Sequence, residues 1–258
     1  MKYIKFEIKE GVGIITLNRP EVYNSFNIPM ALEVQEAFDI CEKDENIRAI
    51  ILTGEGKGFC AGQDLKEATG KNAPTIEHIV NTTYNPIINR IRNIEKPVLG
   101  AINGVAAGAG ANIAIACDIT FASDKASFIQ SFSNIGLIPD SGGTFFLPRL
   151  IGMQRATAHM FLADKMSAQK AKEIGMIYEV VETEQLQKTV FEFAKKLAVR
   201  PTKGFGLTKR ALNQAMTNDL QTQLNVERDL QAIAAKTYDN KEGIDAFLEK
   251  RKPVFKGN

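Results

Sequence analysis

Hydrophobic and polar positions along the first half of the chain predict strands that alternate with helices. Short apolar runs predict strands at 4–8, 12–17, 49–53, 97–102 and 119–122. Met30, Val34 and Phe38 recur at helical spacing within a predicted helix over 28–43, and a second helical pattern covers 76–93. Strands that recur every few dozen residues with helices between them are typical of parallel strands joined by helical crossovers. The pattern therefore predicts an α/β fold.

The second half of the chain is mainly helical after Gly152. Helical patterns cover 168–175, 183–198, 201–239 and 241–251, and a short strand is predicted at 178–181. Loops are predicted at 54–62 and 104–110, and a flexible passage at 72–74. We expect a soft boundary that separates a core of residues 1–198 from a helical C-terminal region of residues 199–258.

Composition and charge disfavour several classes of partner. The 258 residues are 44% hydrophobic and 24% charged. The net charge is only +2, and the sequence shows no stripe of basic residues. Nucleic-acid and membrane-surface binding are therefore not expected. Residues 97–117 lack charge and approach the ~20 apolar residues of a membrane span. Asn103, Asn112 and four glycines in this segment favour a buried strand, turn and helix of a soluble core instead.

Cysteine and histidine usage points to a reducing compartment and to no metal site. The three cysteines Cys41, Cys60 and Cys117 show no paired spacing, and the chain has only two histidines. A disulfide framework and a zinc site are therefore not expected. The N-terminus alternates polar and apolar residues and has no apolar signal core. We expect a cytoplasmic protein.

Asp140 is the first candidate catalytic residue. It follows Pro139 and precedes Ser141-Gly142-Gly143, in a stretch with no other ionisable group. Proline fixes one backbone angle and glycines permit unusual ones, so this carboxylate sits on a constrained turn. A carboxylate held in this way is a candidate acid or base. It could alternatively serve as a turn residue that caps the amides after it.

Two glycine-rich turns are candidates for binding a carbonyl oxygen. They cover 58–65 and 103–112, and each follows a buried strand. Small residues leave backbone N–H groups free to point at a ligand, so two such turns could form an oxyanion hole. Tight packing of strand against helix would need the same small residues. Dinucleotide, phosphate-loop and serine-hydrolase motifs are incomplete.

Several segments together resemble the enoyl-CoA hydratase/isomerase, or crotonase, superfamily. They are Leu17-Asn18-Arg19-Pro20, Phe59 to Leu65, Lys96 to Gly110, Cys117-Asp118-Ile119, Gly136 to Gly143 and Phe247 to Pro253. The resemblance implies a spiral of repeated ββα units with a helical C-terminal trimerisation region. It implies homotrimers or dimers of trimers that act on acyl-CoA thioesters, with no cofactor because coenzyme A is part of the substrate.

The resemblance also assigns site residues. The backbone N–H groups of Gln63 and Ala109 match the family's oxyanion hole. The substrate pocket would include Asn112, Phe132 and Phe145. The residues expected to bind coenzyme A are Arg19, Ala61, Asp64, Leu65, Phe247 and Lys250, the last two from a neighbouring subunit.

The reaction depends on the carboxylates around the thioester. Family hydratases use two glutamates, whose positions match Asn112 and Phe132 here, so Asp140 is left as the proton carrier. The Asp140 segment is similar to a branch of the family that converts 2-(1,2-epoxy-1,2-dihydrophenyl)acetyl-CoA to oxepin-CoA in phenylacetate catabolism. The alternatives are a Δ3-Δ2-enoyl-CoA isomerase, an enoyl-CoA hydratase, and a non-catalytic homologue that binds acyl-CoA or RNA.

Overall fold

A computed structural model describes residues 1–69, 71 and 73–258 of the chain. Asn72, part of the expected flexible passage, lies outside the described residues. The strands are β1 (Ile4–Lys9), β2 (Val12–Leu17), β3 (Ala49–Gly54), β4 (Gly58–Cys60), β5 (Val98–Ile102), β6 (Val105–Ala107), β7 (Ile119–Ser123), β8 (Ser127–Ile129), β9 (Met166–Ser167) and β10 (Glu179–Val181). Within the described ranges they form a six-stranded sheet, β1-β2-β3-β5-β7-β10, and a four-stranded sheet, β4-β6-β8-β9.

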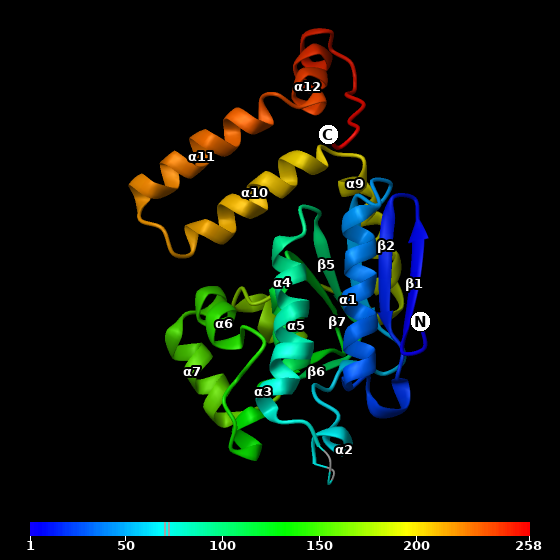
Figure 1. Cartoon of the computed structure of the whole chain (residues 1–258), viewed down its shortest axis with the longest axis vertical. Helices are drawn as coiled ribbons and strands as arrows, with labels where there is room; N and C mark the ends of the chain where they lie inside the picture. Colours follow the sequence, from blue (N-terminus) through cyan, green and yellow to red (C-terminus); the bar gives the residue numbers. More distant parts are fainter. Residues whose placement is uncertain (70, 72) are drawn as a thin grey trace.

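The helices cover the sheets and then extend beyond them (Figure 1). The α-helices are α1 (Ile28–Lys43), α2 (Leu65–Ala68), α3 (Ile76–Ile79), α4 (Asn85–Asn93), α5 (Ala109–Ala116), α6 (Gly143–Ile151), α7 (Met153–Leu162), α8 (Ala168–Glu173), α9 (Leu186–Ala198), α10 (Thr202–Ala215), α11 (Leu220–Ala234) and α12 (Tyr238–Leu248). Short 3-10 turns are η1 (Pro20–Val22), η3 (Ser131–Ile135) and η4 (Thr183–Gln185), and η2 (Val80–Tyr84) is a π-helical turn between α3 and α4.

The central strands β3 and β5 of the six-stranded sheet are buried on both faces, as their apolar runs predict, whereas the edge strand β1 is largely exposed. From β2 to β10 the strands of this sheet run parallel, and β1 alone pairs antiparallel. Along β3, Ile50 and Leu52 join the cluster that includes α1, α4 and α5, while Ala49 and Ile51 pack on the opposite face against α9. This alternation follows from the two-residue period of a strand, and a parallel sheet needs both faces covered.

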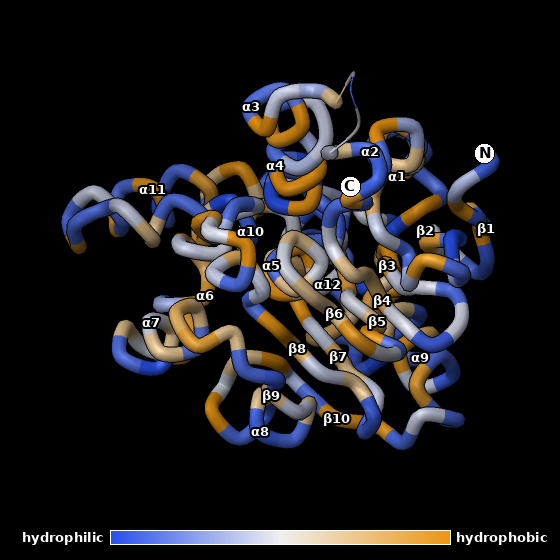
Figure 2. The backbone as a smooth tube through the Cα atoms, turned by 90° about the horizontal axis from the view of Figure 1, so that it is seen from below, coloured by the Kyte–Doolittle hydropathy of each residue, from blue (hydrophilic) through white to orange (hydrophobic). Residues whose placement is uncertain are grey.

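The four-stranded sheet was not predicted from the sequence. β4 lies inside the expected loop at 54–62, and β6 lies inside the expected turn at 104–110. A strand of three residues is too short to show the alternation of apolar and polar residues that is typical of strands. These strands are recognised only by their hydrogen-bonded pairing in the folded structure. β4 pairs parallel with β6, and β6 with β8. Figure 2 shows β6 and β8 as neighbouring segments near the middle of the molecule.

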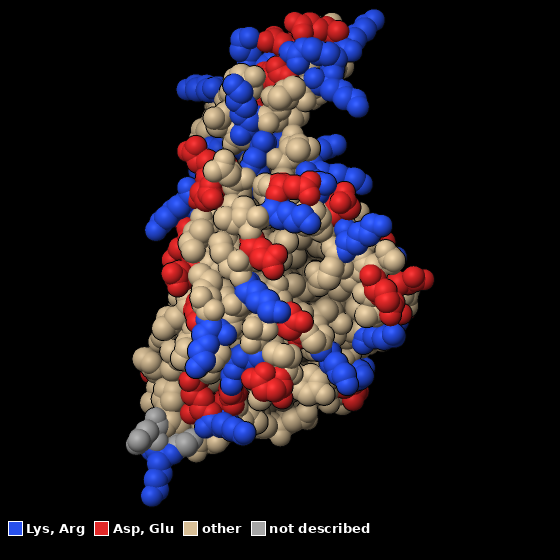
Figure 3. All heavy atoms as spheres, turned by 90° about the vertical axis from the view of Figure 1, so that its right-hand side faces the viewer, with Lys and Arg blue, Asp and Glu red and all other residues tan. Residues whose placement is uncertain are grey.

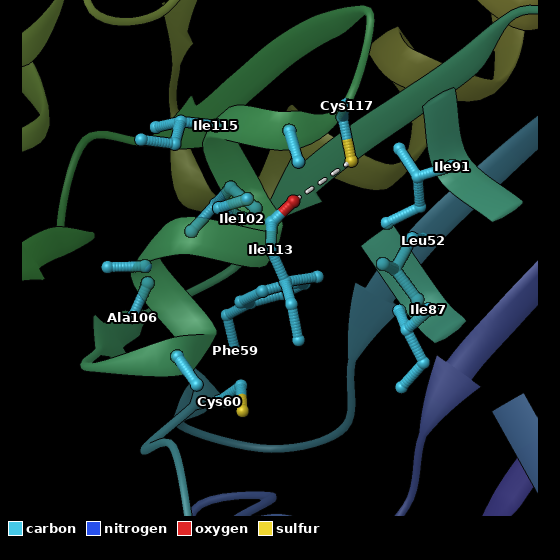
Figure 4. Close-up of a cluster of buried hydrophobic side chains, with 14 of the residues drawn as sticks. Leu52, Phe59, Cys60, Ile87, Ile91, Ile102, Ala106, Ile113, Ile115 and Cys117 are labelled. Atoms are coloured by element: carbon cyan, nitrogen blue, oxygen red, sulfur yellow. Dashed lines mark hydrogen bonds between the residues drawn. The ribbon is translucent and has the colours of Figure 1, made fainter. Parts of the chain in front are cut away.

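The two sheets together give the spiral that the resemblance implies. Each turn contributes one strand to the large sheet, one to the small sheet and then helical chain: β3 and β4, β5 and β6 with α5, and β7 and β8 with α6. Apolar side chains fill the space between them. Figure 4 shows Leu52 of β3, Phe59 of β4, Ile87 of α4 and Ile113 of α5 meeting in this core.

The C-terminal helices α10, α11 and α12 project away from the sheets (Figure 1). One buried cluster ties α10 to the core. Lys209 contacts Asp118 at 2.7 Å and Arg92 contacts the same carboxylate at 3.1 Å. α12 and α2 lie at opposite ends of the molecule in this view. Among the described residues, no helix combines the length and the apolarity needed to cross a membrane. On the face drawn in Figure 3, acidic and basic side chains are interspersed.

Candidate active site

The turns after β4 and β6 lie side by side and bring Gln63 close to Ala109. A Cβ placed on Gly62 would stand 3.5 Å from the backbone nitrogen of Ala109 and 3.0 Å from the carbonyl oxygen of Ala107. Gly62 has a φ of +88°, a conformation that glycine adopts without a steric penalty. The glycine is therefore needed both for the backbone angle and for the close approach of the two turns.

The backbone N–H groups of Gln63 and Ala109 are free to bind a ligand. Neither has a hydrogen-bond acceptor among the described residues. Ala109 begins α5, and the first N–H groups of a helix find no acceptor within it. The backbone of Phe26 bonds to Gly62 O at 2.7 Å and to Asp64 N at 2.8 Å. These bonds occupy one side of the segment, so the N–H of Gln63 faces the other side.

Side chains around Gln63 hold its turn in place. The Tyr84 hydroxyl donates to Gln63 Oε1 at 2.8 Å, and Gln63 Nε2 donates to Glu67 Oε2 at 3.3 Å. Arg19 forms an ion pair of 2.8 Å with Asp64, and both side chains are only 13% exposed. Each contact comes from a different part of the chain. The donor of the turn is therefore preorganised, which is the condition for effective stabilisation of an oxyanion.

Asp140 lies on a tight turn that leads into α6. Its carbonyl oxygen accepts a hydrogen bond from Gly143 N at 2.8 Å, and its Oδ1 accepts one from the Ser141 hydroxyl at 2.7 Å. Ser141 and Gly142 have φ values of 52° and 74°. A left-handed conformation in a residue other than glycine is costly and is often found at functional sites.

Burial raises the pKa of the Asp140 carboxyl above its ordinary value. The hydrogen bond from Ser141 opposes this effect because it stabilises the charged form. The charge of Asp140 in turn contributes to raising the pKa of the buried Tyr84 phenol, after the larger effect of burial and that of Cys60. Asp140 and the Tyr84–Gln63 pair therefore share one local environment. A raised pKa makes the carboxylate a stronger base, so that it takes up a proton more readily than an ordinary aspartate does.

Asn112 supports the Asp140 turn instead of lining a pocket. Its side chain is fully buried, its Nδ2 donates to Asp140 O at 2.8 Å, and its Oδ1 accepts from Gln130 at 2.8 Å. Asn112 was expected in the substrate pocket, but its side chain is fully buried and its amide group bonds to Asp140 and Gln130 within the protein. Asn112 lies in the same helical turn as Ala109, so Asp140 stands beside the start of α5.

The two expected pocket phenylalanines lie on either side of the Asp140 turn in the sequence. Phe132 is buried, and a Cβ on Gly108 would stand 3.8 Å from its ring, so it packs next to the Ala109 donor. Phe145 is half-buried in the first turn of α6, and the guanidinium of Arg149 lies 3.8 Å from its ring centre. Phe132 thus lies beside the Ala109 donor, while Phe145 is covered on one face by Arg149.

The residues expected to bind coenzyme A fall into two groups. Arg19, Ala61, Asp64 and Leu65 lie around the Gln63 turn. Ala61 and Leu65 are exposed, whereas Arg19 is paired with Asp64, whose Oδ1 also accepts from Lys66 N and caps α2.

Phe247 and Lys250 form the second group. They are exposed at the end of α12, and Phe247 is 83% exposed. Figure 1 places α12 at the opposite end of the molecule from α2, so these two residues do not join the site of their own chain.

Sequence reasoning missed three residues of this region: Tyr84, Gln130 and Ser141 as a donor to Asp140. Tyr84 and Gln130 carry no local signal, because each contacts the site only through the folding of distant segments. For Ser141 the signal was its position directly after the aspartate. Within the described ranges, no three His, Cys, Asp or Glu side chains gather as metal ligands.

The arrangement suits chemistry next to a polarised carbonyl, because two N–H donors and the Asp140 carboxylate lie around the start of α5. A search of family models matches residues 7–258 to enoyl-CoA hydratase/isomerase. The 1,2-epoxyphenylacetyl-CoA isomerase of Escherichia coli (strain K12) is 47% identical, over 100% of this chain and 99% of the relative. A probable enoyl-CoA hydratase of Rhodobacter capsulatus is 41% identical, over 98% of each chain.

Comparison of the fold with solved structures identifies the same family. The crystal structure of an enoyl-CoA hydratase from Bacillus anthracis matches with a TM-score of 0.95 and 36% identity, over 100% of both chains. The match extends through the C-terminal helices as well as the spiral. The chain is thus an enzyme of acyl-CoA isomerisation or hydration and belongs to the enoyl-CoA hydratase/isomerase, or crotonase, family.

Proposed function

We propose that the protein is an acyl-CoA isomerase in which Asp140 moves a proton next to the thioester. One observation carries this proposal: Asp140 is the carboxylate held beside the start of α5, while Asn112 and Phe132 stand at the positions that the family resemblance assigns to the hydratase glutamates. An amide and a phenyl ring cannot activate water as a carboxylate does. A single carboxylate is enough for isomerisation, because the base and its conjugate acid are the same group.

The mechanism begins with binding of the thioester oxygen by Gln63 N–H and Ala109 N–H. Asp140 then removes a proton from the carbon next to the carbonyl, and the electron pair moves onto the oxygen as an enolate. The protonated Asp140 returns this proton to a carbon further along the conjugated system, and the double bond shifts. Loss of one oxyanion donor typically costs ~3–4 kcal/mol of transition-state stabilisation. No redox change occurs, so the reaction requires no cofactor.

We propose 2-(1,2-epoxy-1,2-dihydrophenyl)acetyl-CoA as the substrate and its isomer oxepin-CoA as the product. For this substrate the C–C bond between the two epoxide carbons breaks and the ring double bonds reorganise, so that the six-membered ring expands to a seven-membered ring that contains the oxygen. Asp140 moves a proton from the carbon next to the carbonyl to a ring carbon, so atoms and electrons balance without another reactant. The name of the 47% identical relative supports this choice. The buried ring of Phe132 beside the N–H donors is also compatible with a flat, apolar acyl group. A Δ3-Δ2-enoyl-CoA isomerase would use the same two donors and the same base.

We further propose that residues 199–258 form the oligomerisation region and that residues 1–198 form the catalytic core. Leu212, Leu220 and Leu224 are exposed on α10 and α11 and would be covered in a trimer or a dimer of trimers. A second copy would then supply Phe247 and Lys250 to the coenzyme A. The three cysteines are buried free thiols, which suits the reducing cytoplasm.

Hydration is the second candidate, because the Rhodobacter relative and the Bacillus anthracis structure carry hydratase names. The test compares turnover of epoxyphenylacetyl-CoA, a 3-enoyl-CoA and a 2-enoyl-CoA by wild-type protein and by Asp140→Asn. We expect the first two to isomerise and the variant to lose activity by about 10²–10⁴-fold, the usual contribution of a general base. Near wild-type isomerisation by Asp140→Asn would reject the assignment. Binding of all three thioesters without turnover would favour a non-catalytic homologue.

A further inference from the structure

Asn112 connects the two halves of the candidate site. Its backbone belongs to the first turn of α5, which begins at the Ala109 donor, and its side chain donates to the carbonyl oxygen of Asp140 at 2.8 Å. The contact is tight: a Cβ on Gly143 would stand only 2.4 Å from Asn112 Nδ2. The amide therefore fills the space between α5 and the start of α6.

The orientation of the Asn112 amide is fixed by hydrogen-bond chemistry. A carbonyl oxygen can only accept, so Asn112 must present its NH₂ group to Asp140. Its Oδ1 then faces Gln130, which must present Nε2, at 2.8 Å. Gln130 is itself fully buried, and its own Oε1 has no hydrogen-bond partner among the described residues. The polar pair thus leaves one buried acceptor unpaired among the described residues, which is an unfavourable arrangement.

We propose that Asn112, oriented by Gln130, is a positioning residue that fixes the Asp140 backbone against the first turn of α5. The base and the Ala109 donor then move as one unit. The expected effect on the reaction rate rests on the proposed function. If Asp140 is the base and Ala109 N–H binds the thioester oxygen, both groups must stay at fixed positions relative to the same thioester. Misplacement of a reacting group by about 1 Å costs up to 10²-fold in rate.

The test uses a double variant, Asn112→Leu with Gln130→Met. Replacing both partners of a buried hydrogen bond by apolar groups of similar shape is close to neutral for stability, so the fold is expected to survive. The control is Thr120→Val. Thr120 is also buried and donates to α5, at Ala114 O and 2.7 Å, but at the end of the helix away from Asp140.

Two measurements are made on the full-length variants. The first is kcat and KM with epoxyphenylacetyl-CoA and with a 3-enoyl-CoA. We expect kcat to fall by about 10- to 100-fold in the double variant while KM stays within about twofold, because the thioester still binds at the two N–H donors. Thr120→Val should keep its kcat. A merely structural role would lower the amount of active protein and leave the kcat per active site unchanged.

The second measurement is hydrogen exchange of the Gly143 amide, which bonds to Asp140 O and reports on the turn without any substrate. We expect its exchange to be at least about 10-fold faster in the double variant, because opening of the turn becomes easier. Unchanged protection of this amide would overturn the proposal, as would a kcat within twofold of wild type. If wild-type protein turned over neither thioester, the proposed function would fail, and the exchange result alone would decide the role of Asn112.

Discussion

The hydroxyl of Ser141 donates a 2.7 Å hydrogen bond to Oδ1 of Asp140, from a residue whose φ of 52° lies in the left-handed region. The bond lowers the pKa of the carboxyl, whereas burial raises it by more. The serine thus limits how far burial raises the pKa of Asp140. The unusual backbone angle brings its hydroxyl back to the side chain of the residue before it.

Ser141→Ala should shift the pH dependence of isomerisation upward. Asp140 acts as a base in its ionised form, and loss of a donor to that form raises its pKa. The acid limb of the kcat/KM profile should therefore move to higher pH, while the activity at alkaline pH changes little. Ser141→Gly should give the same shift with higher stability, because glycine removes the left-handed strain. A downward shift in either variant would contradict this reading of the Ser141 bond.

Asp140→Asn should stabilise the fold at neutral pH. The folded-state pKa of Asp140 is raised, so the folded protein binds this proton more tightly than the unfolded chain does. Its contribution to stability is therefore fully present below the unfolded pKa and is lost as pH rises through the folded pKa. The asparagine amide of the variant does not ionise, so the variant does not lose this stability as the pH rises. Urea denaturation at pH 7 and pH 4 should show the advantage of the variant shrinking at the lower pH; an equal advantage at both would disprove the explanation.

Gly62→Ala should damage the oxyanion hole beyond its effect on stability. The new methyl group would press on Ala107 O at 3.0 Å and approach Ala109 N at 3.5 Å, at a φ of +88°. We expect kcat/KM to fall by about 10²–10³-fold, as after loss of one donor. The matched control is Gly152→Ala, which has a φ of +80° and no atom within 4 Å of the added methyl.

Both glycine variants should lose about 1–3 kcal/mol of stability, because residues other than glycine rarely adopt these positive φ angles. Only Gly62→Ala should lose activity per folded molecule. Thermal unfolding and steady-state kinetics on the same samples separate the two effects. Equal kinetics in the two variants would show that the Gly62 approach does not matter for catalysis.

Tyr84→Phe should loosen the Gln63 turn. It removes the 2.8 Å hydrogen bond to Gln63 Oε1 while it keeps the edge-to-face packing of the ring against Phe26. We expect kcat to fall by about 3- to 10-fold, the equivalent of one net hydrogen bond of about 0.5–1.5 kcal/mol. Tyr178→Phe, a tyrosine that is 58% exposed and packs against Phe121, is the control and should not change kcat. Unaltered kcat in Tyr84→Phe would mean that the turn is rigid without this bond.

The sequence predicted the large sheet and most helices because their signals are local and repeated. In β3, four apolar residues in a row are enough to predict a strand buried on both faces. The expected helix over 76–93 is present as α3, η2 and α4, although its π-helical turn at Val80–Tyr84 was not predicted. That turn ends at the tyrosine that contacts Gln63, and π-helical turns often occur at functional sites.

The small sheet escaped prediction for the opposite reason. β4 and β6 have three residues each, and their hydrogen bonds join segments more than forty residues apart. The propensity of three residues decides nothing by itself. Pairing in space determines these strands, and they set the positions of the Gln63 and Ala109 turns.

Asp140 and the two glycine-rich turns were evident from the sequence by itself, because proline, glycine and a lone carboxylate in an uncharged stretch are local features. Only the tertiary structure decided what surrounds them. Asn112 was expected to contact the substrate, and instead it is buried against Asp140 and Gln130. Composition shows which groups are present, but the direction of a side chain and the partners of its polar atoms depend on which distant segments pack against it.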